Sequence, residues 1–345
     1  MAQVREALAA AGFAPELRAG FGGKRQMLAA RFAPRAPLRH GAPAPPQWSE
    51  RRALVVGAGL AGAGVAERLV ARGWKVELIE RHAVPAAEAS GMAAGIIHPQ
   101  VSRDDSVLSR LTRAGFLYAL RAWHALERRG HRFAWARCGV LQTARDAREE
   151  RRMADSARAL GNPADYVQYL PREEAGRRAG LSTRNGGLWF PEGGWVRPVD
   201  LVASLLEAAR PGLTFFPGRT VNALVREGDR WLVLAPDGAP IAAAPVVVLA
   251  NAHDAARLVP VATPLRRVRG QLTCLPPGSI EPPDAVVAGA GHLIPAVDGS
   301  AVVGSTYDFE DDDPEPSAEG HAGNLERLEL LLPGSAARLD PAPLA

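Results

Sequence analysis

Residues 53–62 read Ala53-Leu54-Val55-Val56-Gly57-Ala58-Gly59-Leu60-Ala61-Gly62, an apolar run that passes directly into three spaced glycines. The apolar run predicts a short buried strand, and the residues that follow the glycines carry a helical apolar period. Residues 75–80 (KVELIE) predict a second strand. Strand, helix and strand within about 30 residues make a βαβ unit, so we expect an α/β fold with a parallel sheet.

The three glycines form a Gly-x-Gly-x-x-Gly motif between the predicted strand and helix, which is the setting of a dinucleotide site. Gly57 permits the tight turn, Gly59 lets a diphosphate approach the backbone, and Gly62 lets the helix pack closely on the strand. Glu80 ends the second strand, where a carboxylate accepts hydrogen bonds from ribose hydroxyls and argues against the 2′-phosphate of NADP. The cofactor contacts predicted in this unit are Gly57, Gly59, Leu60, Ala61, Gly62, Glu80 and Arg81.

Length and composition restrict the class of protein. A chain of 345 residues with 47% apolar content predicts about two domains with their own cores. Two cysteines exclude a disulfide scaffold, and Cys138 and Cys274 are expected to be reduced thiols. No apolar stretch reaches the ~18 residues of a membrane span, and the charged start does not resemble an export signal. We therefore expect a cytoplasmic protein with no membrane contact.

The region before residue 51 has a different composition from the rest. Residues 1–32 predict a short helix and two strands, which is too little to close a core. Residues 33–50 are rich in Pro and Ala and predict a linker. The first 32 residues are therefore expected to be the tail of another domain.

Basic residues cluster in two regions. Residues 1–52 hold nine Lys or Arg against three acids, and residues 103–152 hold twelve Arg against six acids. Such an excess attracts phosphate backbones. The alternative is an Arg-rich proteome, since 39 of the 41 basic residues are Arg.

Strand signals in residues 221–250, separated by Gly228 and by residues 236–238 (PDG), predict an antiparallel meander rather than further βαβ units.

Three segments resemble the glycine oxidase and D-amino-acid oxidase group of flavoproteins: residues 53–80, residues 89–99 (ASGMAAGIIHP) and residues 246–252 (VVVLANA). The resemblance implies FAD as the cofactor. It also implies that a Ser- and Gly-rich loop passes beside the flavin ring, although residues 90–95 also read as a flexible surface loop. The further cofactor contacts that it implies are Ser90, Gly91, Gly95 and His98 at the flavin, Val221 at the adenine, and Ala250 and Asn251 closing the site.

The chain is still more similar to the oxidoreductase half of the MnmC-type bifunctional tRNA 5-methylaminomethyl-2-thiouridine biosynthesis family. Four pieces carry this resemblance: residues 89–115, 193–198 (GGWVRP), 269–271 (RGQ) and 295–307. Residues 4–32 look like the last hairpin of that family's methyltransferase domain.

The resemblance implies a Rossmann-like FAD-binding domain interleaved with a mainly antiparallel substrate domain. The implied boundaries are 51–130 and 196–262 for the FAD-binding domain, 131–195 and 263–312 for the substrate domain, and 313–345 for an incomplete C-terminal segment.

Two departures from the family pattern affect the expected activity. The methyltransferase body is not in this sequence, so we expect no methyl transfer. The loop that caps the flavin in the family after residues 304–307 is not matched either, and its loss would leave the ring exposed.

The implied substrate is the 5-carboxymethylaminomethyl side chain of a tRNA wobble uridine. Oxidation of its glycine-like Cα–H and hydrolysis of the resulting imine would give glyoxylate and the 5-aminomethyl form. Arg269 and Arg197 are candidate partners for the substrate carboxylate, because a guanidinium group binds a carboxylate through two hydrogen bonds. Either arginine would alternatively tie strands together. Tyr307 is a candidate to flank the substrate, or is an ordinary strand aromatic.

The sequence allows two roles for His98 and gives no metal-binding pattern at His124 and His131. His98 is a candidate base, but it would equally hydrogen-bond the backbone or the ring. His124 and His131 have no partners at metal-ligand spacing, so no metal is expected.

Two rival functions stay open. The first is a glycine- or sarcosine-type oxidase of a small amine, and the second is a truncated remnant that does not retain FAD. The basic surface discriminates between RNA and a small amine: RNA loses its support if Arg110, Arg113, Arg121 and Arg128 point into the core or pair with acids.

Overall fold

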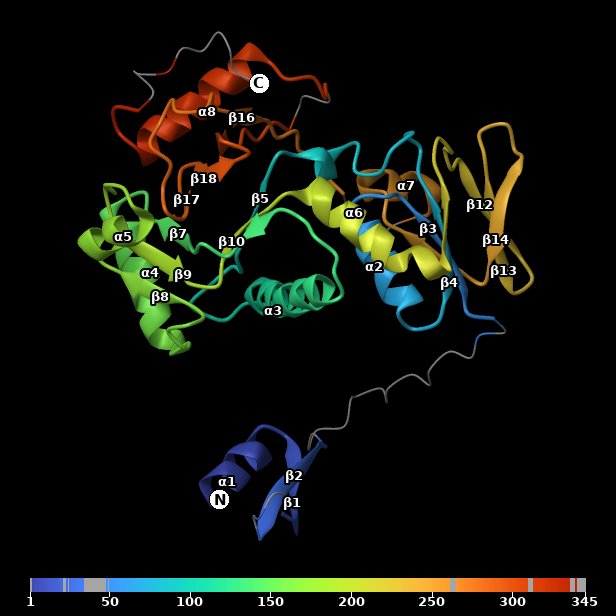
Figure 1. The fold of residues 1–345 in the computed structure, drawn as a ribbon, viewed down its shortest axis with the longest axis horizontal. Helices are drawn as coiled ribbons and strands as arrows, with labels where there is room; N and C mark the ends of the chain where they lie inside the picture. The colour runs from blue at the N-terminus through green and yellow to red at the C-terminus, as the bar shows by residue number, and fades with distance from the viewer. Residues whose placement is uncertain are drawn as a thin grey trace. The chain divides into compact units, whose positions relative to one another are not determined.

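The computed structural model describes residues 2–20, 23, 25–33, 48, 50–260, 265–309, 313–335 and 339. The chain divides into two compact units, Met1–Ser49 and Glu50–Ala345 (Figure 1). The linker expected at residues 33–50 lies almost wholly outside the described residues.

The first unit is a helix beside a hairpin. Helix α1 covers Ala2–Ala10, and strands β1 (Phe13–Ala19) and β2 (Gln26–Phe32) pair antiparallel along their whole length. The expected helix and two strands are confirmed. Helix α1 has no buried residue, in keeping with an element too small to enclose a core of its own. Its descent from a methyltransferase domain stays a prediction.

A four-stranded parallel sheet, ordered β11-β4-β3-β15, forms the first layer of the second unit. Its strands are β3 (Arg52–Val56), β4 (Lys75–Ile79), β11 (Leu213–Phe216) and β15 (Val246–Leu249). The side chains of Leu54 and Val55 are fully buried, as an all-apolar strand requires. Helix α2 (Leu60–Val70) connects β3 to β4, and α6 (Pro198–Ala209) packs against α2. The expected βαβ unit is confirmed.

The expected meander is only partly correct. Strands β12 (Ala223–Glu227), β13 (Arg230–Leu234) and β14 (Pro240–Ala244) form an antiparallel three-stranded sheet. The last expected strand leaves this meander, because β15 pairs parallel with β3. Its four consecutive apolar residues suit a strand covered on both faces, whereas a half-exposed meander strand alternates apolar and polar residues.

A seven-stranded mixed sheet, ordered β16-β19-β18-β17-β7-β9-β8, forms the other large layer. Its strands are β7 (Val140–Thr143), β8 (Gln168–Leu170), β9 (Gly187–Phe190), β16 (Leu272–Cys274), β17 (Val286–Ala288), β18 (His292–Val297) and β19 (Ser300–Gly304). All neighbours are antiparallel except β17 and β7. Helices α5 (Arg172–Ala179) and α8 (Ala318–Leu331) cover one face, and α4 (Ala147–Leu160) lies against β8 and β9.

The second unit also contains smaller elements. Strands β5 (Gly95–Ile97), β10 (Gly194–Val196) and β6 (Trp135–Ala136) form a three-stranded sheet. The long helix α3 covers Val107–Arg128, and it begins where the Ser106 hydroxyl accepts a hydrogen bond from the Ser109 amide. The short elements are η1 (Ala89–Gly91), η2 (Arg210–Gly212), η3 (Ala252–Asp254) and α7 (Ala255–Leu258).

The architecture confirms an α/β fold with a Rossmann-like unit and a mainly antiparallel second sheet. The parallel strands fall within residues 52–79 and 213–249, and the strands of the seven-stranded sheet fall within 140–190 and 272–304. The domain boundaries inferred from the sequence stay a prediction.

Two features are absent from the part of the chain that the structure describes. No helix there has the length and apolar character needed to cross a membrane. No group of three His, Cys, Asp or Glu side chains there is arranged to hold a metal ion. Cys138 and Cys274 are both free thiols, as expected.

Candidate functional site

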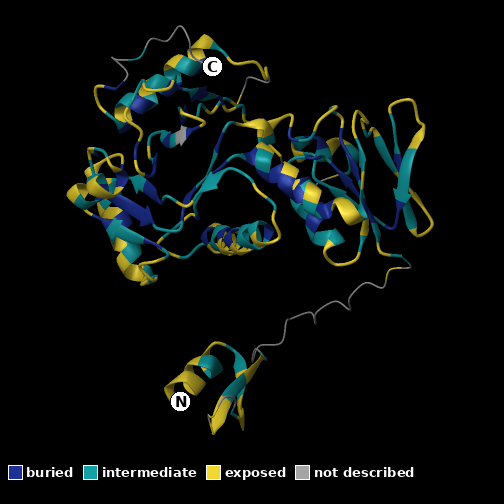
Figure 2. Ribbon diagram, viewed as in Figure 1, coloured by how far each residue is buried: buried dark blue, intermediate teal, exposed yellow. Residues whose placement is uncertain are grey.

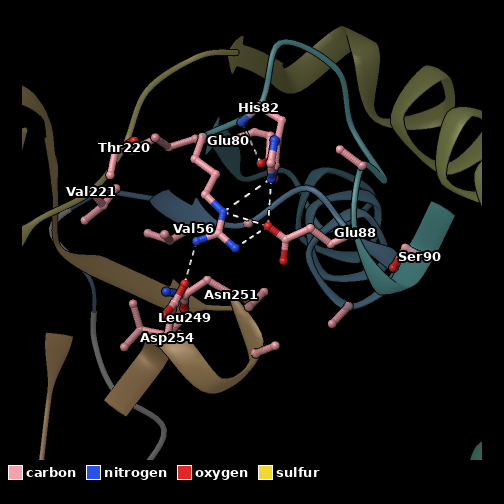
Figure 3. A pocket seen from close by; sticks show the side chains of 18 of the residues that line it. Val56, Glu80, His82, Glu88, Ser90, Thr220, Val221, Leu249, Asn251 and Asp254 are labelled. Carbon is pink, nitrogen blue, oxygen red and sulfur yellow. Dashed lines mark hydrogen bonds and ion pairs between the residues drawn. The ribbon is translucent and has the colours of Figure 1, made fainter. Parts of the chain in front are cut away.

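A cavity of about 490 Å³ opens beyond the carboxyl ends of three parallel strands. Val56, Ile79 and Leu249 are the last residues of β3, β4 and β15, and all three line the cavity. Val56 and Leu249 are labelled in Figure 3. In open parallel sheets, ligands bind beyond these strand ends. The cavity is therefore the candidate ligand site, because it lies at the place where such sheets bind ligands.

The glycine turn after β3 forms one wall of the cavity. Gly57 has φ of +100°, and a Cβ built there would lie 2.7 Å from the Ala250 carbonyl oxygen. A Cβ on Gly62 would lie 1.8 Å from the Gly57 carbonyl oxygen. Only glycine fits at both positions, so the backbone of the turn and the first turn of α2 come into direct contact.

The first turn of α2 presents backbone amides to the cavity. Gly59 is the N-cap residue of α2, and a Cβ there would lie 2.9 Å from the Ser90 hydroxyl oxygen. The Leu60 amide donates to that hydroxyl at 3.0 Å. The amides of Gly59 and Ala61 have no acceptor within the helix, because first-turn amides lack the preceding carbonyl. Both residues line the cavity, so this wall suits an anion.

Glu80 forms the acidic end of the cavity. Its carboxylate accepts hydrogen bonds from the Ala58 amide at 2.7 Å and from the His82 amide at 2.9 Å. The residue is buried and lines the cavity. Each carboxylate oxygen keeps acceptor capacity, so ribose hydroxyls would find acceptors here.

Charged side chains also line the cavity. The Arg81 guanidinium contacts the carboxylates of Glu88 and Asp254, the latter at 2.6 Å. Burial acts to raise the pKa of Asp254, but the nearby charges of His253, Arg81 and Arg257 hold that pKa below its usual value. Figure 3 shows Glu88 and Asp254 on different segments of the chain, with dashed lines joining each carboxylate to a guanidinium group that lies between them. These ion pairs tie the loop before η1 to η3.

Ten of the sequence-predicted residues come together in this cavity, and they are Gly57, Gly59, Leu60, Ala61, Glu80, Arg81, Ser90, Val221, Ala250 and Asn251. The lining residues that the sequence reasoning missed include His82, Glu88, Arg219, Thr220, Asp254 and Arg257. The signal that could have identified them is their place in the sequence, since Arg219 and Thr220 follow β11 and Asp254 follows β15. Residues just past the ends of parallel strands are ligand-site candidates in any such sheet.

Seven predicted residues do not line the cavity, and they are Gly62, Gly91, Gly95, His98, Arg197, Arg269 and Tyr307. His98 follows β5, its ring lies 5.1 Å from that of Phe190, and its Nδ1 lies 3.0 Å from the Pro99 carbonyl oxygen. Burial lowers the pKa of His98, which keeps the ring neutral near pH 7. This geometry matches the hydrogen-bonding alternative for His98.

The two candidate carboxylate anchors have partners in the structure. Arg197 Nη1 lies 2.5 Å from Asp298 Oδ2, which joins the start of α6 to the turn between β18 and β19. The Arg269 guanidinium donates to the carbonyl oxygens of Asp313 and Glu315. These contacts correspond to the alternative in which the arginines tie segments together. Tyr307 is 71% exposed and does not line the described cavity.

The residues present fit the ADP part of a dinucleotide. Two unpaired amides at a helix N-terminus suit the diphosphate, and Glu80 suits the ribose. Asn251 Oδ1 is buried and makes no hydrogen bond within the described part of the chain, so it has capacity for a ligand donor. Val221 adds apolar surface for a base.

Comparisons with known proteins give the same picture. The family model described as FAD dependent oxidoreductase matches residues 52–342. A relative from Paraburkholderia phytofirmans, called tRNA 5-methylaminomethyl-2-thiouridine biosynthesis bifunctional protein MnmC, is 48% identical over 342 residues. That match covers 98% of this chain and 52% of the relative, so the chain spans about half the length of the curated relatives it matches.

Solved structures share the fold. A glycine oxidase from Geobacillus kaustophilus superposes with a TM-score of 0.68 at 23% identity, covering 83% of this chain and 80% of that one. An L-alpha-glycerophosphate oxidase from Mycoplasma pneumoniae, solved with FAD bound, gives a TM-score of 0.71 at 20% identity, covering 86% and 81%.

Proposed function

The chain belongs to the family of FAD-dependent oxidoreductases, and from that premise we propose that it oxidises a modified wobble uridine of tRNA. The proposed reaction removes the carboxymethyl group of 5-carboxymethylaminomethyl-2-thiouridine and leaves the 5-aminomethyl form. Oxidation of the Cα–N bond gives an imine, which water hydrolyses to release the two lost carbons as glyoxylate. Dioxygen takes up the two electrons and two protons and leaves as hydrogen peroxide. A cytoplasmic location, where tRNA is modified, belongs to the same proposal.

The observation that carries the proposal is the similarity to proteins named for this modification pathway. Identity of 48% extends over 98% of the chain, and it therefore includes the described cavity. Those relatives are about twice as long as this chain, so the activity of the whole relative is not transferred to it. The proposal concerns the oxidative step alone, because the described cavity fits a dinucleotide.

The residues of this chain have separate tasks in holding FAD. The Gly59 and Ala61 amides would hold the diphosphate, Glu80 the ribose hydroxyls, and Val221 the adenine. Bound FAD supplies an acceptor for the hydride of the substrate Cα–H. The remaining work of the protein is to bind the substrate amine and carboxylate in one orientation.

Arg197 is the better of the two candidate partners for the substrate carboxylate. Its present partner is the carboxylate of Asp298, whose side chain is 67% exposed. A substrate carboxylate would therefore take the place of another carboxylate on the same guanidinium group. Arg269 instead donates to backbone carbonyls that hold the segment before α8. Arg197 also directly follows β10, which pairs with β5 of the loop assigned to the flavin by resemblance.

The test uses the purified full-length chain with its flavin. Bound FAD is measured from the visible absorbance and from the cofactor released on denaturation. The protein is then incubated with tRNA that carries 5-carboxymethylaminomethyl-2-thiouridine, and glyoxylate and digested nucleosides are quantified. We expect equal amounts of glyoxylate and the 5-aminomethyl nucleoside. Glyoxylate from free glycine or sarcosine, with none from tRNA, would overturn the proposal in favour of a small-amine oxidase.

A further inference from the structure

Helix α3 has one face in the core and one face in solvent. Phe116, Leu120 and Leu126 are buried, and Leu126 belongs to the cluster formed with α6. On the opposite side, large apolar residues and arginines are exposed. Figure 2 shows buried and exposed residues alternating along this helix. An exposed face of this composition is a candidate interaction surface.

Three arginines form a straight row on the exposed face. Arg110, Arg121 and Arg128 are separated by eleven and seven residues, which are about three and two turns of an α-helix. They therefore share one side of α3 and extend over about 27 Å of its axis. All three residues are exposed.

The arginines of this row differ from their neighbours in their ion pairs. Among the residues that the structure describes, no carboxylate lies within ion-pair distance of Arg110, Arg121 or Arg128. Other arginines nearby are paired: Arg113 binds the Asp105 carboxylate through two hydrogen bonds, and Arg129 contacts buried Glu67 at 3.0 Å. The charge of Arg110 also acts on the Asp105 carboxylate, which is already bound by Arg113, so Arg110 shares an acid while Arg121 and Arg128 form no ion pair with the described residues.

Apolar side chains lie beside the row. Val107, Leu111 and Tyr118 follow helical spacing, and they are 72%, 67% and 46% exposed. Tyr118 lies three residues before Arg121 on the helix. Its hydroxyl also interacts with Arg68, which pairs with Glu67. Proteins bind single-stranded nucleic acid with an aromatic ring near cations, since the ring stacks on a base and the cations contact phosphates. A protein partner would have to supply three carboxylates at this spacing, whereas RNA presents repeated phosphates.

We propose that this face of α3, defined by Arg110, Arg121, Arg128 and Tyr118, is the docking surface for the tRNA. The proposal rests on the proposed function and adds to it the surface that binds the macromolecule. The segment 98–106 joins α3 directly to β5, the strand of the loop that the resemblance assigns to the flavin. The Gln100 amide also donates to Thr112 Oγ1 at 3.0 Å, which fixes that segment on the helix.

The test measures binding of an unmodified tRNA transcript to the full-length protein over a range of salt concentrations. In the variant Arg110→Gln/Arg121→Gln/Arg128→Gln, we expect at least tenfold weaker binding. We also expect the slope of log K against log salt to fall by about 2 to 3, because each lost phosphate contact removes about one unit. The Arg→Lys triple variant keeps the charges and should keep most of the slope.

A matched control removes the same charge elsewhere. Arg158, Arg177 and Arg210 are exposed and each is paired with an acid on its own helix or the one before it. Their triple Gln variant should bind tRNA as the unaltered protein does. Equal weakening in both triple variants would overturn the proposal, because it would show only a general charge effect.

Two further outcomes would also overturn it. One is unchanged tRNA affinity and slope in the α3 variant. The other is that sedimentation shows self-association, that Val107→Ser/Leu111→Ser abolishes it, and that tRNA binding is unchanged when the three arginines are replaced. That result would make this face a protein interface. Failure of the proposed function looks different, since it gives no glyoxylate at saturating modified tRNA while the unmodified transcript still binds through the arginine row.

Discussion

The Glu80 carboxylate accepts a hydrogen bond from the Ala58 amide, with 2.7 Å between Oε2 and the nitrogen. The two residues are 22 positions apart, at the end of β4 and in the turn after β3. The acid expected to recognise ribose therefore also fixes the turn that faces the diphosphate. Both parts of the candidate cofactor site depend on one buried side chain.

Replacing Glu80 with Gln should damage the turn and the cofactor site together. The amide group would place an NH₂ opposite either the Ala58 or the His82 amide, so one backbone donor would lose its acceptor. We expect a loss of about 1–3 kcal/mol in the free energy of unfolding and a lower FAD content. Chemical denaturation and flavin absorbance measure the two effects. Glu192→Gln, at an exposed ion pair with Arg137, is the control and should change neither.

Two glycines close together in sequence should respond oppositely to alanine. Gly57 has φ of +100° and its Cβ would meet the Ala250 carbonyl oxygen, so Gly57→Ala should destabilise the fold and prevent FAD retention. A Cβ on Gly64, within α2, meets nothing within 4 Å. Gly64→Ala should therefore stabilise the protein by up to about 1 kcal/mol. Thermal unfolding of both variants checks this, and equal melting temperatures would contradict it.

The βαβ unit was predictable because local signals and tertiary structure agree there. The apolar run 53–56, the glycine spacing and Glu80 each depend on residues close in sequence, and the structure places them as expected. The path of residues 246–249 was not predictable from turn signals alone. Its parallel pairing with β3 joins segments almost 200 residues apart, and only its lack of alternation indicated burial on both faces.

The site was predictable on the side formed by local motifs and not on the side formed by distant loops. Arg81 was expected, but its contact with Asp254 spans 173 residues and no local pattern encodes it. Asp254 follows β15, so its role emerges only once β15 is known to belong to the parallel sheet. The error in the meander and the missed contact of Asp254 therefore share one cause, whereas Arg219 and Thr220 were missed because they follow another strand, β11.

The stability of the second unit should fall in mild acid because of His292. Burial lowers the pKa of His292 to about 4, from 6.5 in an unfolded chain. The folded protein then holds the ring neutral, while unfolding lets it bind a proton. The stability gained by keeping this ring neutral is fully present above about pH 6.5 and is lost as the pH falls toward 4. The free energy of unfolding should therefore fall by about 2 kcal/mol from pH 7.5 to about pH 5.

Denaturant unfolding at both pH values checks the His292 prediction. In His292→Gln the difference in unfolding free energy between the two pH values should shrink by most of that amount. His131→Gln, in the loop after α3, should leave the difference unchanged. A pH dependence that is the same in the His292 variant and the unaltered protein would show that the acid sensitivity arises elsewhere.

Helix α8 is held to β16 by a side chain with no access to solvent, Asn324. Its Nδ2 donates to the Gln271 carbonyl oxygen at 2.9 Å and to Thr273 Oγ1 at 3.0 Å. Asn324→Leu removes both donors and should cost about 1–3 kcal/mol of unfolding free energy. Asn324→Asp should cost more at neutral pH, because a buried carboxylate would face two acceptors, and its penalty should fall in acid as the carboxyl is protonated. Exposed Glu326 on the same helix supplies the control, Glu326→Gln, and an Asp variant as stable as the Leu variant at neutral pH would show that solvent reaches this contact.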